Sequence, residues 1–224
     1  MAKKATRAAE RREDALSRER IVEAAIELLD EEGESGLTFR ALSTRLATGA
    51  GAIYWHIANK SELLVAASDA IVLRALADVG DRASPRKTVR NIAAGLFDAI
   101  DAHPWVGAQL YRAPWQAAML QVFERIGRQL QALKVPAAAH FRSASTLVSY
   151  IVGVSVQNAA NGRLFDPPVD REEFLERVAD RWKALDADEY PFTRKVATQM
   201  RKHDDRAEFL GGIDLILAGV VRSS

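Results

Sequence analysis

Apolar side chains recur with the 3.6-residue period of an α-helix along nearly the whole chain, and no segment alternates as a half-buried strand would. Ile21, Ala25, Leu28 and Leu29, for example, fall on one face of a single helix. The chain has 224 residues, of which 48% are hydrophobic, so it can build a substantial core. The sequence therefore predicts an all-α fold.

Gaps in this periodicity separate a group of short N-terminal helices from a longer C-terminal helical bundle. The main break falls at residues 80–87, GDRASPRK, and later prolines lie at or near helix boundaries, where helices tolerate them. The C-terminal helices are expected at residues 87–102, 104–111, 114–134, 137–163, 171–185, 192–202 and 206–221.

The N-terminal helices have clear start and stop signals. A first helix begins after an N-cap at Ser17 and ends at Gly33, and Thr38 caps a short second helix. A turn follows, and a third short helix places Ile53 and Ile57 on one face. Two short helices joined by a tight turn and braced by a longer helix form a helix-turn-helix.

The tip of this unit combines small residues with a polar aromatic block. Residues 48–52 are all small, and they precede Tyr54-Trp55-His56 and then Asn59-Lys60. In a helix-turn-helix the second helix points its N-terminal end at the bases of the major groove. Small side chains let the backbone approach DNA closely, while the flanking aromatic and lysine side chains can bind phosphate. Taken alone, three aromatics at helical spacing are more often a buried corner between helices.

The stretch GLTFRALSTRLATGAGAIYWHIANKSELL resembles the DNA-binding domain of TetR-type transcriptional regulators. That family's pattern is Leu-Thr, an Ala/Leu-rich second helix, a turn, and then Leu-Tyr-x-His-Phe/Val-x-Asn-Lys-x-x-Leu. The matching residues are Leu37, Thr38, Leu42, Leu46, Ile53, Tyr54, His56, Ile57, Asn59, Lys60, Leu63 and Leu64. The resemblance spans about residues 17–66, and the end of the chain, from ADEYPFTRKVATQM to LAGV, resembles the end of the tetracycline-repressor-like C-terminal domain.

Two positions depart from the family pattern, and both bear on how DNA is read. Ala47 stands where glycine is common, and Gly49 stands where serine or threonine is common. The tip itself, residues 50–52, offers no bidentate base contact, so we assign base reading to Arg40 with help from Thr38, and the rest to DNA shape. The predicted DNA-binding residues are Thr38, Arg40, Gly49, Ala50, Gly51, Ala52, Tyr54, Trp55, His56 and Lys60.

A unit this small spans only one half-site, so we expect a homodimer on double-stranded operator DNA. Residues 142–163 are apolar nearly all round, and residues 206–221 carry an apolar stripe. Two such helices from each subunit make an isologous four-helix bundle, which is also the family's usual dimer, while one face of each belongs to the subunit's own core. The predicted interface residues are Leu147, Ile151, Val154, Asn158, Phe209, Ile213, Ile216 and Val220.

The resemblance further implies a small-molecule inducer that binds in the C-terminal half and shifts the helix linking the two domains. An apolar lining with a few polar groups is expected within residues 100–123. The predicted ligand-binding residues are His103, Trp105, Gln109, Tyr111, Arg112, Trp115, Met119 and Phe123. The spacing of Trp115, Met119 and Phe123 is equally typical of an ordinary core stripe.

Relatives that sense tetracycline hold the drug with a metal and a histidine. Only His103 and His140 lie in the corresponding region, and neither has a second ligand at recognisable spacing. We therefore expect no metal and no cofactor. The chain also has no cysteine, which excludes disulfides and zinc–thiolate sites.

The first 20 residues carry seven basic and four acidic side chains. This composition fits either a flexible basic arm over residues 1–16 or a simple solvated tail. The same stretch lacks the apolar segment of a signal peptide, and the most apolar stretch, residues 147–156, is too short to cross a bilayer. We expect a cytoplasmic protein with no membrane partner.

The sequence thus predicts an arm (1–16), a three-helix helix-turn-helix domain (17–66) and a helical ligand-binding and dimerisation bundle (67–224). The expected function is a ligand-responsive transcriptional regulator, by resemblance a repressor. Two alternatives remain open: a DNA-binding regulator without a ligand switch, and a helical enzyme. Enzymatic signals are weak, because Gly49-Ala50-Gly51 lacks the preceding strand and third glycine of a dinucleotide loop, and no catalytic motif is present.

Overall fold

The computed structural model describes residues 16–80, 83–112, 116–162 and 170–222. These residues form helices and turns without any strand, which confirms the all-α prediction. They divide into two compact units, one from the described part of Met1–Asp78 with Ala102–Val122, the other from the described part of Val79–Asp101 with Phe123–Ser224. The expected arm over residues 1–16 falls almost wholly outside the described residues.

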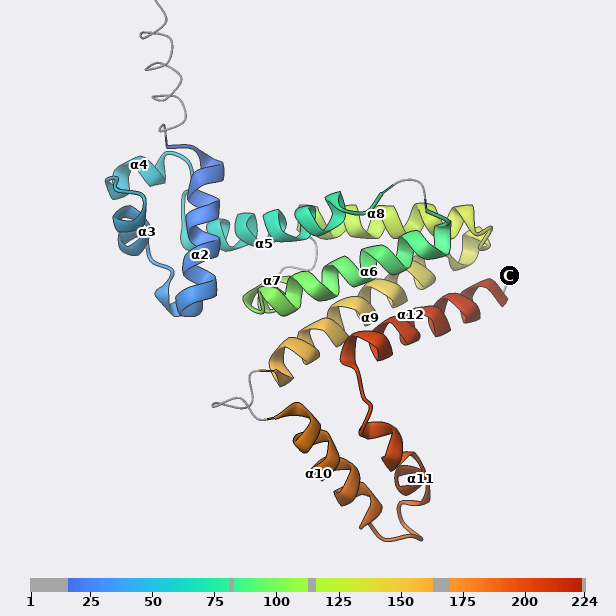
Figure 1. The fold of residues 1–224 in the computed structure, drawn as a ribbon. Coiled ribbons are helices and arrows are strands. Elements are labelled where there is room, and N and C mark those ends of the chain that lie inside the picture. Colours follow the sequence, from blue (N-terminus) through green and yellow to red (C-terminus); the bar gives the residue numbers. More distant parts are fainter. Residues whose placement is uncertain (1–15, 81–82, 113–115, 163–169, 223–224) are drawn as a thin grey trace, which may run out of the picture. The chain divides into compact units, whose positions relative to one another are not determined.

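The first unit contains the helices of the predicted DNA-binding domain (Figure 1). They are α2 (Arg18–Gly36), α3 (Phe39–Arg45), α4 (Ala50–Tyr54) and α5 (Lys60–Ala77), joined by α7 (Trp105–Arg112) and the beginning of α8 (Ala117–Ala132). Helix α2 packs against α3, α5 and α7, and α3 packs against α4. The largest fully buried side chains of this unit are Ile21, Leu29, Leu37, Leu42, Ile53, Ile57, Leu63 and Leu76.

Local capping rules explain where these helices begin. The side chains of Ser17, Thr38 and Asn59 each accept a hydrogen bond from the backbone N–H three residues ahead. At Gly33 the backbone leaves the helix with φ 69° and ψ −171°, which interrupts α2 where the sequence predicts a stop. A positive φ of this kind is comfortable only for glycine.

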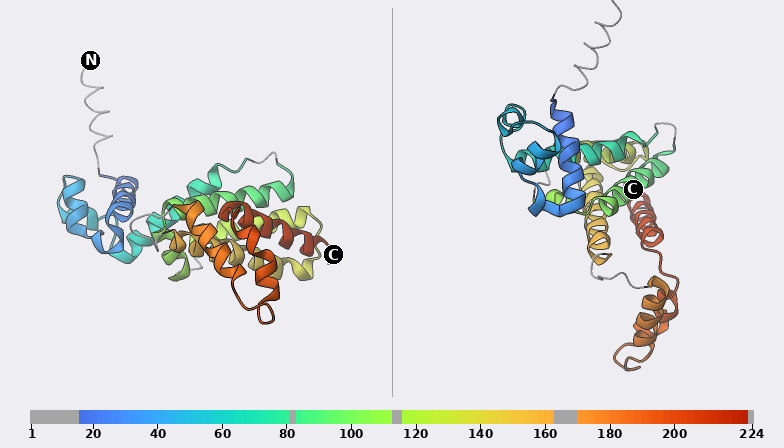
Figure 2. Two further views of the ribbon diagram at one scale, coloured as in Figure 1. Left: turned by 60° about the horizontal axis from the view of Figure 1, so that its bottom comes forward. Right: turned by 60° about the vertical axis from the view of Figure 1, so that its left-hand side comes forward.

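The second unit contains α6 (Pro85–Ala102), the rest of α8, the short 3-10 turn η1 (Ala137–Ala139) and α9 (His140–Asn161). It continues with α10 (Arg171–Lys183), α11 (Pro191–Met200) and α12 (Asp205–Arg222). Helices α9 and α12 pack side by side, as the right-hand view of Figure 2 shows, and α10 and α11 form an antiparallel pair (Figure 1). The helices expected from the sequence agree with these bounds to within a few residues.

The contact between α9 and α12 depends on a stack of aromatic rings. Phe209 stacks on Phe97 with ring centroids 4.7 Å apart and on Tyr150 at 5.6 Å, and the Tyr150 hydroxyl donates to the Phe209 carbonyl at 3.2 Å. Burial raises the pKa of Tyr150. A Cβ atom at Gly212 would overlap the Tyr150 hydroxyl, so close packing of these two helices requires glycine at this position.

None of the helices within the described ranges is long and apolar enough to cross a membrane.

Candidate nucleic-acid interface

The turn between α3 and α4 is held by backbone hydrogen bonds. Thr48 N donates to the Ser43 carbonyl at 3.0 Å, and Leu46 N donates to the Leu42 carbonyl at 2.9 Å. Ala47 lies between them with φ 49°, in the left-handed region that disfavours a side chain. This geometry explains why glycine is common at the corresponding position of the family that the sequence resembles.

The N-terminal end of α4 presents backbone rather than side chains. Gly49 occupies the N-cap position without a side-chain hydrogen bond, and Gly49, Ala50 and Gly51 are exposed while Ala52 is half-buried. Ile53 and Ile57 are fully buried and anchor the short helix from below. The tip can therefore come close to a partner surface without disturbing the core.

The aromatic block beside the tip is on the surface. Tyr54 is 53% exposed and its ring stacks flat on Phe39, with centroids 4.4 Å apart, while Trp55 is 90% exposed. His56 is exposed as well. None of the three side chains is buried, so they do not form the buried aromatic corner that their spacing alone would also allow.

Two cations predicted to bind DNA have different surroundings. Arg40 is exposed, and its guanidinium takes part in none of the hydrogen bonds or ion pairs among the described residues. Lys60 is half-buried and its Nζ donates to the backbone carbonyl of Glu34, just after the break in α2. Lys60 therefore anchors the end of α2, a role that the sequence analysis did not anticipate.

A network centred on Glu62 fixes the segment between α4 and α5. Glu62 accepts hydrogen bonds from Ala58 N at 2.9 Å and Arg18 Nη1 at 2.8 Å, and Arg18 also donates to the His56 carbonyl at 3.0 Å. The hydrogen bond from Ala58, followed by that from Arg18, lowers the pKa of Glu62. The Asn59-x-x-Glu62 spacing of a capping box was the available sequence signal for this network.

Three of the predicted ligand-binding residues make polar contacts with α2. Asp30 Oδ1 and Oδ2 lie 2.8 and 2.9 Å from His103 Nδ1. Asp30 Oδ1 also accepts a hydrogen bond from Trp105 Nε1 at 2.7 Å. Arg112 Nη1 donates to Glu34 at 2.8 Å. These contacts tie α7 to α2, and the sequence analysis did not identify the two acidic partners.

The other predicted ligand residues differ in burial. Gln109 and Met119 are buried, each 5% exposed, and Phe123 is half-buried. Tyr111 is 69% exposed, and Trp115 lies outside the described residues.

Gln116, which the sequence analysis missed, has an unusual environment at the start of α8. It is 8% exposed, and its Oε1 accepts a hydrogen bond from the Ser68 hydroxyl at 3.3 Å. Its Nε2 is buried and has no hydrogen-bond partner among the described residues. Nearby, Asp69 Oδ1 accepts from Ala118 N at 3.3 Å, and burial raises the pKa of Asp69.

The two histidines considered as metal ligands contact other groups. His103 faces Asp30, and His140 Nε2 lies 2.7 Å from the Val135 carbonyl. Within the described part of the chain, no three His, Asp or Glu side chains gather in a way that could hold a metal ion.

Two family descriptions match the sequence. Residues 21–67 match the bacterial regulatory proteins of the tetR family, and residues 82–223 match the tetracycline repressor-like C-terminal domain. This chain belongs to the TetR family. It is a DNA-binding transcriptional regulator, and TetR-family regulators are not enzymes.

Similar proteins support the same assignment. The TetR regulator SCO7222 of Streptomyces coelicolor is 53% identical, with 93% of this chain and 99% of that chain covered at a TM-score of 0.86. Tetracycline repressor protein class D of Escherichia coli is 26% identical over 213 residues, covering 91% of this chain and 88% of the repressor. BioQ, solved with its double-stranded DNA operator, is 25% identical, with coverages of 84% and 100% and a TM-score of 0.57.

The predicted dimer residues of this TetR-family chain fall into two groups. Leu147, Ile151, Phe209 and Ile213 are at most 1% exposed, so their side chains lie in the core of the second unit. The half-buried group is Val154, Asn158, Ile216 and Val220. Leu215, one position away from the predicted stripe, is 75% exposed.

Proposed function

We propose that this TetR-family regulator is a repressor that binds palindromic operator DNA as a homodimer and is released by a small-molecule inducer. The observation that carries the proposal is the exposed tip of α4, flanked by the exposed side chains of Arg40, Tyr54, Trp55 and His56. Two relatives support it, because class D is by name a repressor and the BioQ structure contains operator DNA.

In the proposed complex, residues 49–52 approach the major groove and the residues around them divide the work. Arg40 and Thr38 face base edges, where a guanidinium suits the two acceptors of guanine. Tyr54, Trp55 and His56 contact phosphates from the flank, which positions the helix without reading sequence. Lys60 contributes equally to the binding of every DNA sequence, because its contact with Glu34 holds the end of α2 in place.

Paired substitutions test this division of roles. Arg40→Ala should weaken binding to a selected operator by about 1–3 kcal/mol more than binding to scrambled DNA. Lys60→Ala should weaken both alike. Arg45→Ala is the matched control on the same helix, because the Arg45 guanidinium is bound to Glu31 of α2. Equal losses on operator and scrambled DNA for Arg40→Ala would contradict the assignment.

We propose that the dimer forms through the outer faces of α9 and α12. The inner faces are occupied by the subunit's own core, which leaves the half-buried Val154, Ile216 and Val220 and the exposed Leu215 as interface candidates. Partly exposed apolar side chains gathered on two adjacent helices are typical of a protein contact surface. The predicted four-helix bundle is retained, with its contacts moved to this outer face.

We propose that the inducer binds beside Gln116. A buried amide N–H without a partner costs about 1–3 kcal/mol, and a ligand acceptor would satisfy it. The buried Gln109 and Met119 are retained from the predicted lining. Because α7 is tied to α2 through Asp30, displacement of α7 by the ligand would act on the helix that packs against α3.

A thermal-shift screen followed by DNA-binding assays tests the switch. A compound that stabilises the protein should also release operator DNA, and Gln116→Met should weaken the response by removing the amide donor. Stabilising compounds that leave DNA binding unchanged would favour a regulator without a ligand switch.

A further inference from the structure

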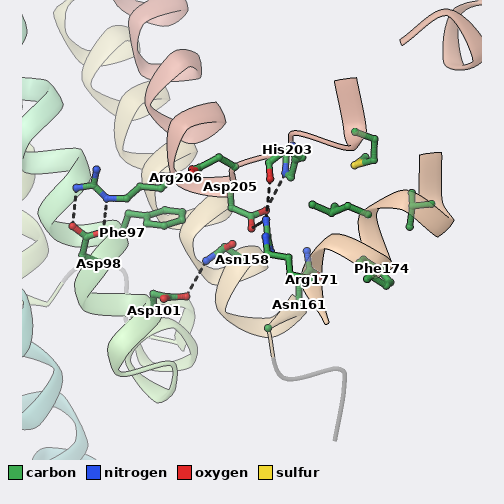
Figure 3. A pocket seen from close by; sticks show the side chains of 15 residues that line it. Phe97, Asp98, Asp101, Asn158, Asn161, Arg171, Phe174, His203, Asp205 and Arg206 are labelled. Atoms are coloured by element: carbon green, nitrogen blue, oxygen red, sulfur yellow. Dashed lines mark hydrogen bonds and ion pairs between the residues drawn. The ribbon is translucent and has the colours of Figure 1, made fainter. Parts of the chain in front are cut away.

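Three pairs of aromatic rings stack face to face among the described residues. Two of them share Phe209, which is 1% exposed, and belong to the core of the second unit. There Phe97 lies in the wall of a cavity of about 750 Å³, where the C-terminal ends of α6 and α9 meet α10, the end of α11 and the beginning of α12 (Figure 3). The third pair, Phe39 and Tyr54, lies in the first unit at the surface that is proposed to face DNA. This position points to a role beyond core packing.

Hydrogen bonds at the start of α3 fix the backbone of Phe39. The preceding residue, Thr38, caps the helix by accepting from Ala41 N at 3.1 Å, and its carbonyl accepts from Leu42 N at 3.0 Å. The Phe39 carbonyl itself accepts from the Ser43 hydroxyl at 2.7 Å. Leu42 is fully buried and anchors the same turn in the core. The half-buried Phe39 ring therefore starts from a fixed base.

Tyr54 has much less support from its own helix. It is the last of the five residues of α4, a helix too short to be stable by itself. Tyr54 is 53% exposed, and its hydroxyl takes part in no hydrogen bond among the described residues. Its ring stacks on that of Phe39 with centroids 4.4 Å apart and planes 4° apart. The stack thus restricts a side chain whose hydroxyl is free to bind a partner.

We propose that Phe39 is a positioning residue of the DNA interface, which holds the Tyr54 hydroxyl where it donates to a DNA phosphate. The inference rests on the phosphate contact proposed above for Tyr54. A donor on a fixed ring loses less conformational freedom on binding than a donor on a freely rotating side chain, so it binds more tightly. Phe39 acts in this arrangement through Tyr54 and not through a DNA contact of its own.

A double-mutant cycle on the full chain tests this coupling, with a labelled DNA duplex followed by fluorescence anisotropy. Tyr54→Phe keeps the stacked ring and removes the hydroxyl, whereas Phe39→Leu keeps an apolar side chain and removes the stack. In the wild-type background Phe39→Leu should weaken DNA binding about three- to tenfold, the range expected for one aromatic pair. In the Tyr54→Phe background it should change the affinity by less than about twofold. Equal losses in both backgrounds mean that Phe39 only supports the fold, and overturn the proposal.

The Tyr54→Phe variant alone separates this inference from the phosphate contact on which it rests. Its affinity should fall about tenfold or more, as expected for a lost hydrogen bond to a charged acceptor. If it binds as tightly as wild type, the phosphate contact is wrong and the proposal fails with it. If it binds more weakly but Phe39→Leu has no effect, the phosphate contact stands and the role of Phe39 alone is overturned. Phosphate contacts do not read sequence, so a scrambled duplex serves as well as an operator, and the test is independent of the repressor assignment.

The salt dependence of binding distinguishes a misplaced hydroxyl from a disrupted DNA-binding unit. A neutral hydroxyl displaces no counterion from DNA, so the slope of log affinity against log salt concentration should be the same for Phe39→Leu and wild type. A flatter slope means that cationic contacts were lost together with the fold of the tip, and overturns the proposal.

Two further variants test whether the aromatic ring itself is needed. Phe39→Tyr keeps a ring for the stack and should retain the wild-type affinity within about twofold. A loss as large as that of Phe39→Leu overturns the proposal. The matched control is Phe192→Leu, which removes a 74% exposed ring from α11 in the second unit and should leave DNA binding unchanged. A loss that Phe192→Leu reproduces means a nonspecific effect and also overturns the proposal.

Discussion

The carboxylate of Asp30 connects α2 to α7 through its bonds with Trp105 and His103. Trp105 is only 8% exposed, and Asp30→Ala removes the acceptor of its indole N–H. A hydrogen bond to a charged acceptor contributes about 1.5–3 kcal/mol. The partly exposed His103 contact adds up to about 1 kcal/mol. We therefore expect Asp30→Ala to lower the free energy of unfolding by about 1.5–4 kcal/mol.

Urea denaturation followed by tryptophan fluorescence measures this loss, at one protein concentration because the proposed dimerisation would add to stability. Glu32→Ala, an exposed change on the same helix, should cost less than about 0.5 kcal/mol. In a Trp105→Phe background, which lacks the N–H donor, Asp30→Ala should lose only the smaller histidine contribution. The reasoning is refuted if Asp30→Ala costs no more than Glu32→Ala, or costs the same in both backgrounds.

Three further changes have definite expected outcomes. Hydrogen bonds hold the pKa of Glu62 below its ordinary value of 4.5, so its carboxylate stabilises the fold above that pH, and this stabilisation is lost as the pH falls through the lowered pKa. The melting temperature of Glu62→Gln should therefore depend less on acid pH than that of the wild type. An identical pH dependence would exclude this role for Glu62. Gly212→Ala should cost about 1–3 kcal/mol in chemical denaturation, because the new methyl overlaps Tyr150. Its control is Gly219→Ala on the same helix, where a Cβ meets no atom within 4 Å, and equal losses would contradict the packing argument. Leu215→Asp should raise the dimer dissociation constant at least about tenfold in sedimentation equilibrium, since it places a charge on the proposed interface, and an unchanged constant would exclude Leu215 from it.

The helices could be predicted from the sequence because their signals are local. Ser17, Thr38 and Asn59 cap helices through atoms only three residues away, and Gly33 interrupts α2 through its own backbone. Such effects do not depend on the rest of the fold. The exposed tip beside Tyr54 followed from the same local pattern.

Contacts between distant parts of the sequence could not be predicted in this way. Asp30 and Trp105 are 75 residues apart, and nothing in their neighbourhoods indicates that they meet. The cavity in the second unit likewise depends on the ends of separate helices. Lys60 matched a DNA-binding pattern by type and position, but its contact with Glu34 emerges only from the fold.

The apolar helices α9 and α12 illustrate a different difficulty. The sequence shows that α9 is apolar nearly all round and that α12 carries an apolar stripe, but it does not separate a face that packs inside the subunit from a face that could meet a partner. Phe209 and Ile213 lie on the inner face and Leu215 on the outer face. Periodicity identifies a helix as buried without identifying which molecule buries it.

Binding of the purified protein to DNA upstream of its own gene and neighbouring genes, followed by fluorescence anisotropy over a range of salt concentrations, tests the central claim most directly. A dimeric sequence-reading repressor should bind one of these fragments saturably, with two protomers per high-affinity site, and should stay bound in excess competitor DNA. Weak binding of equal strength to every fragment, lost steeply as salt increases, would show phosphate contact without reading of sequence and would contradict the account.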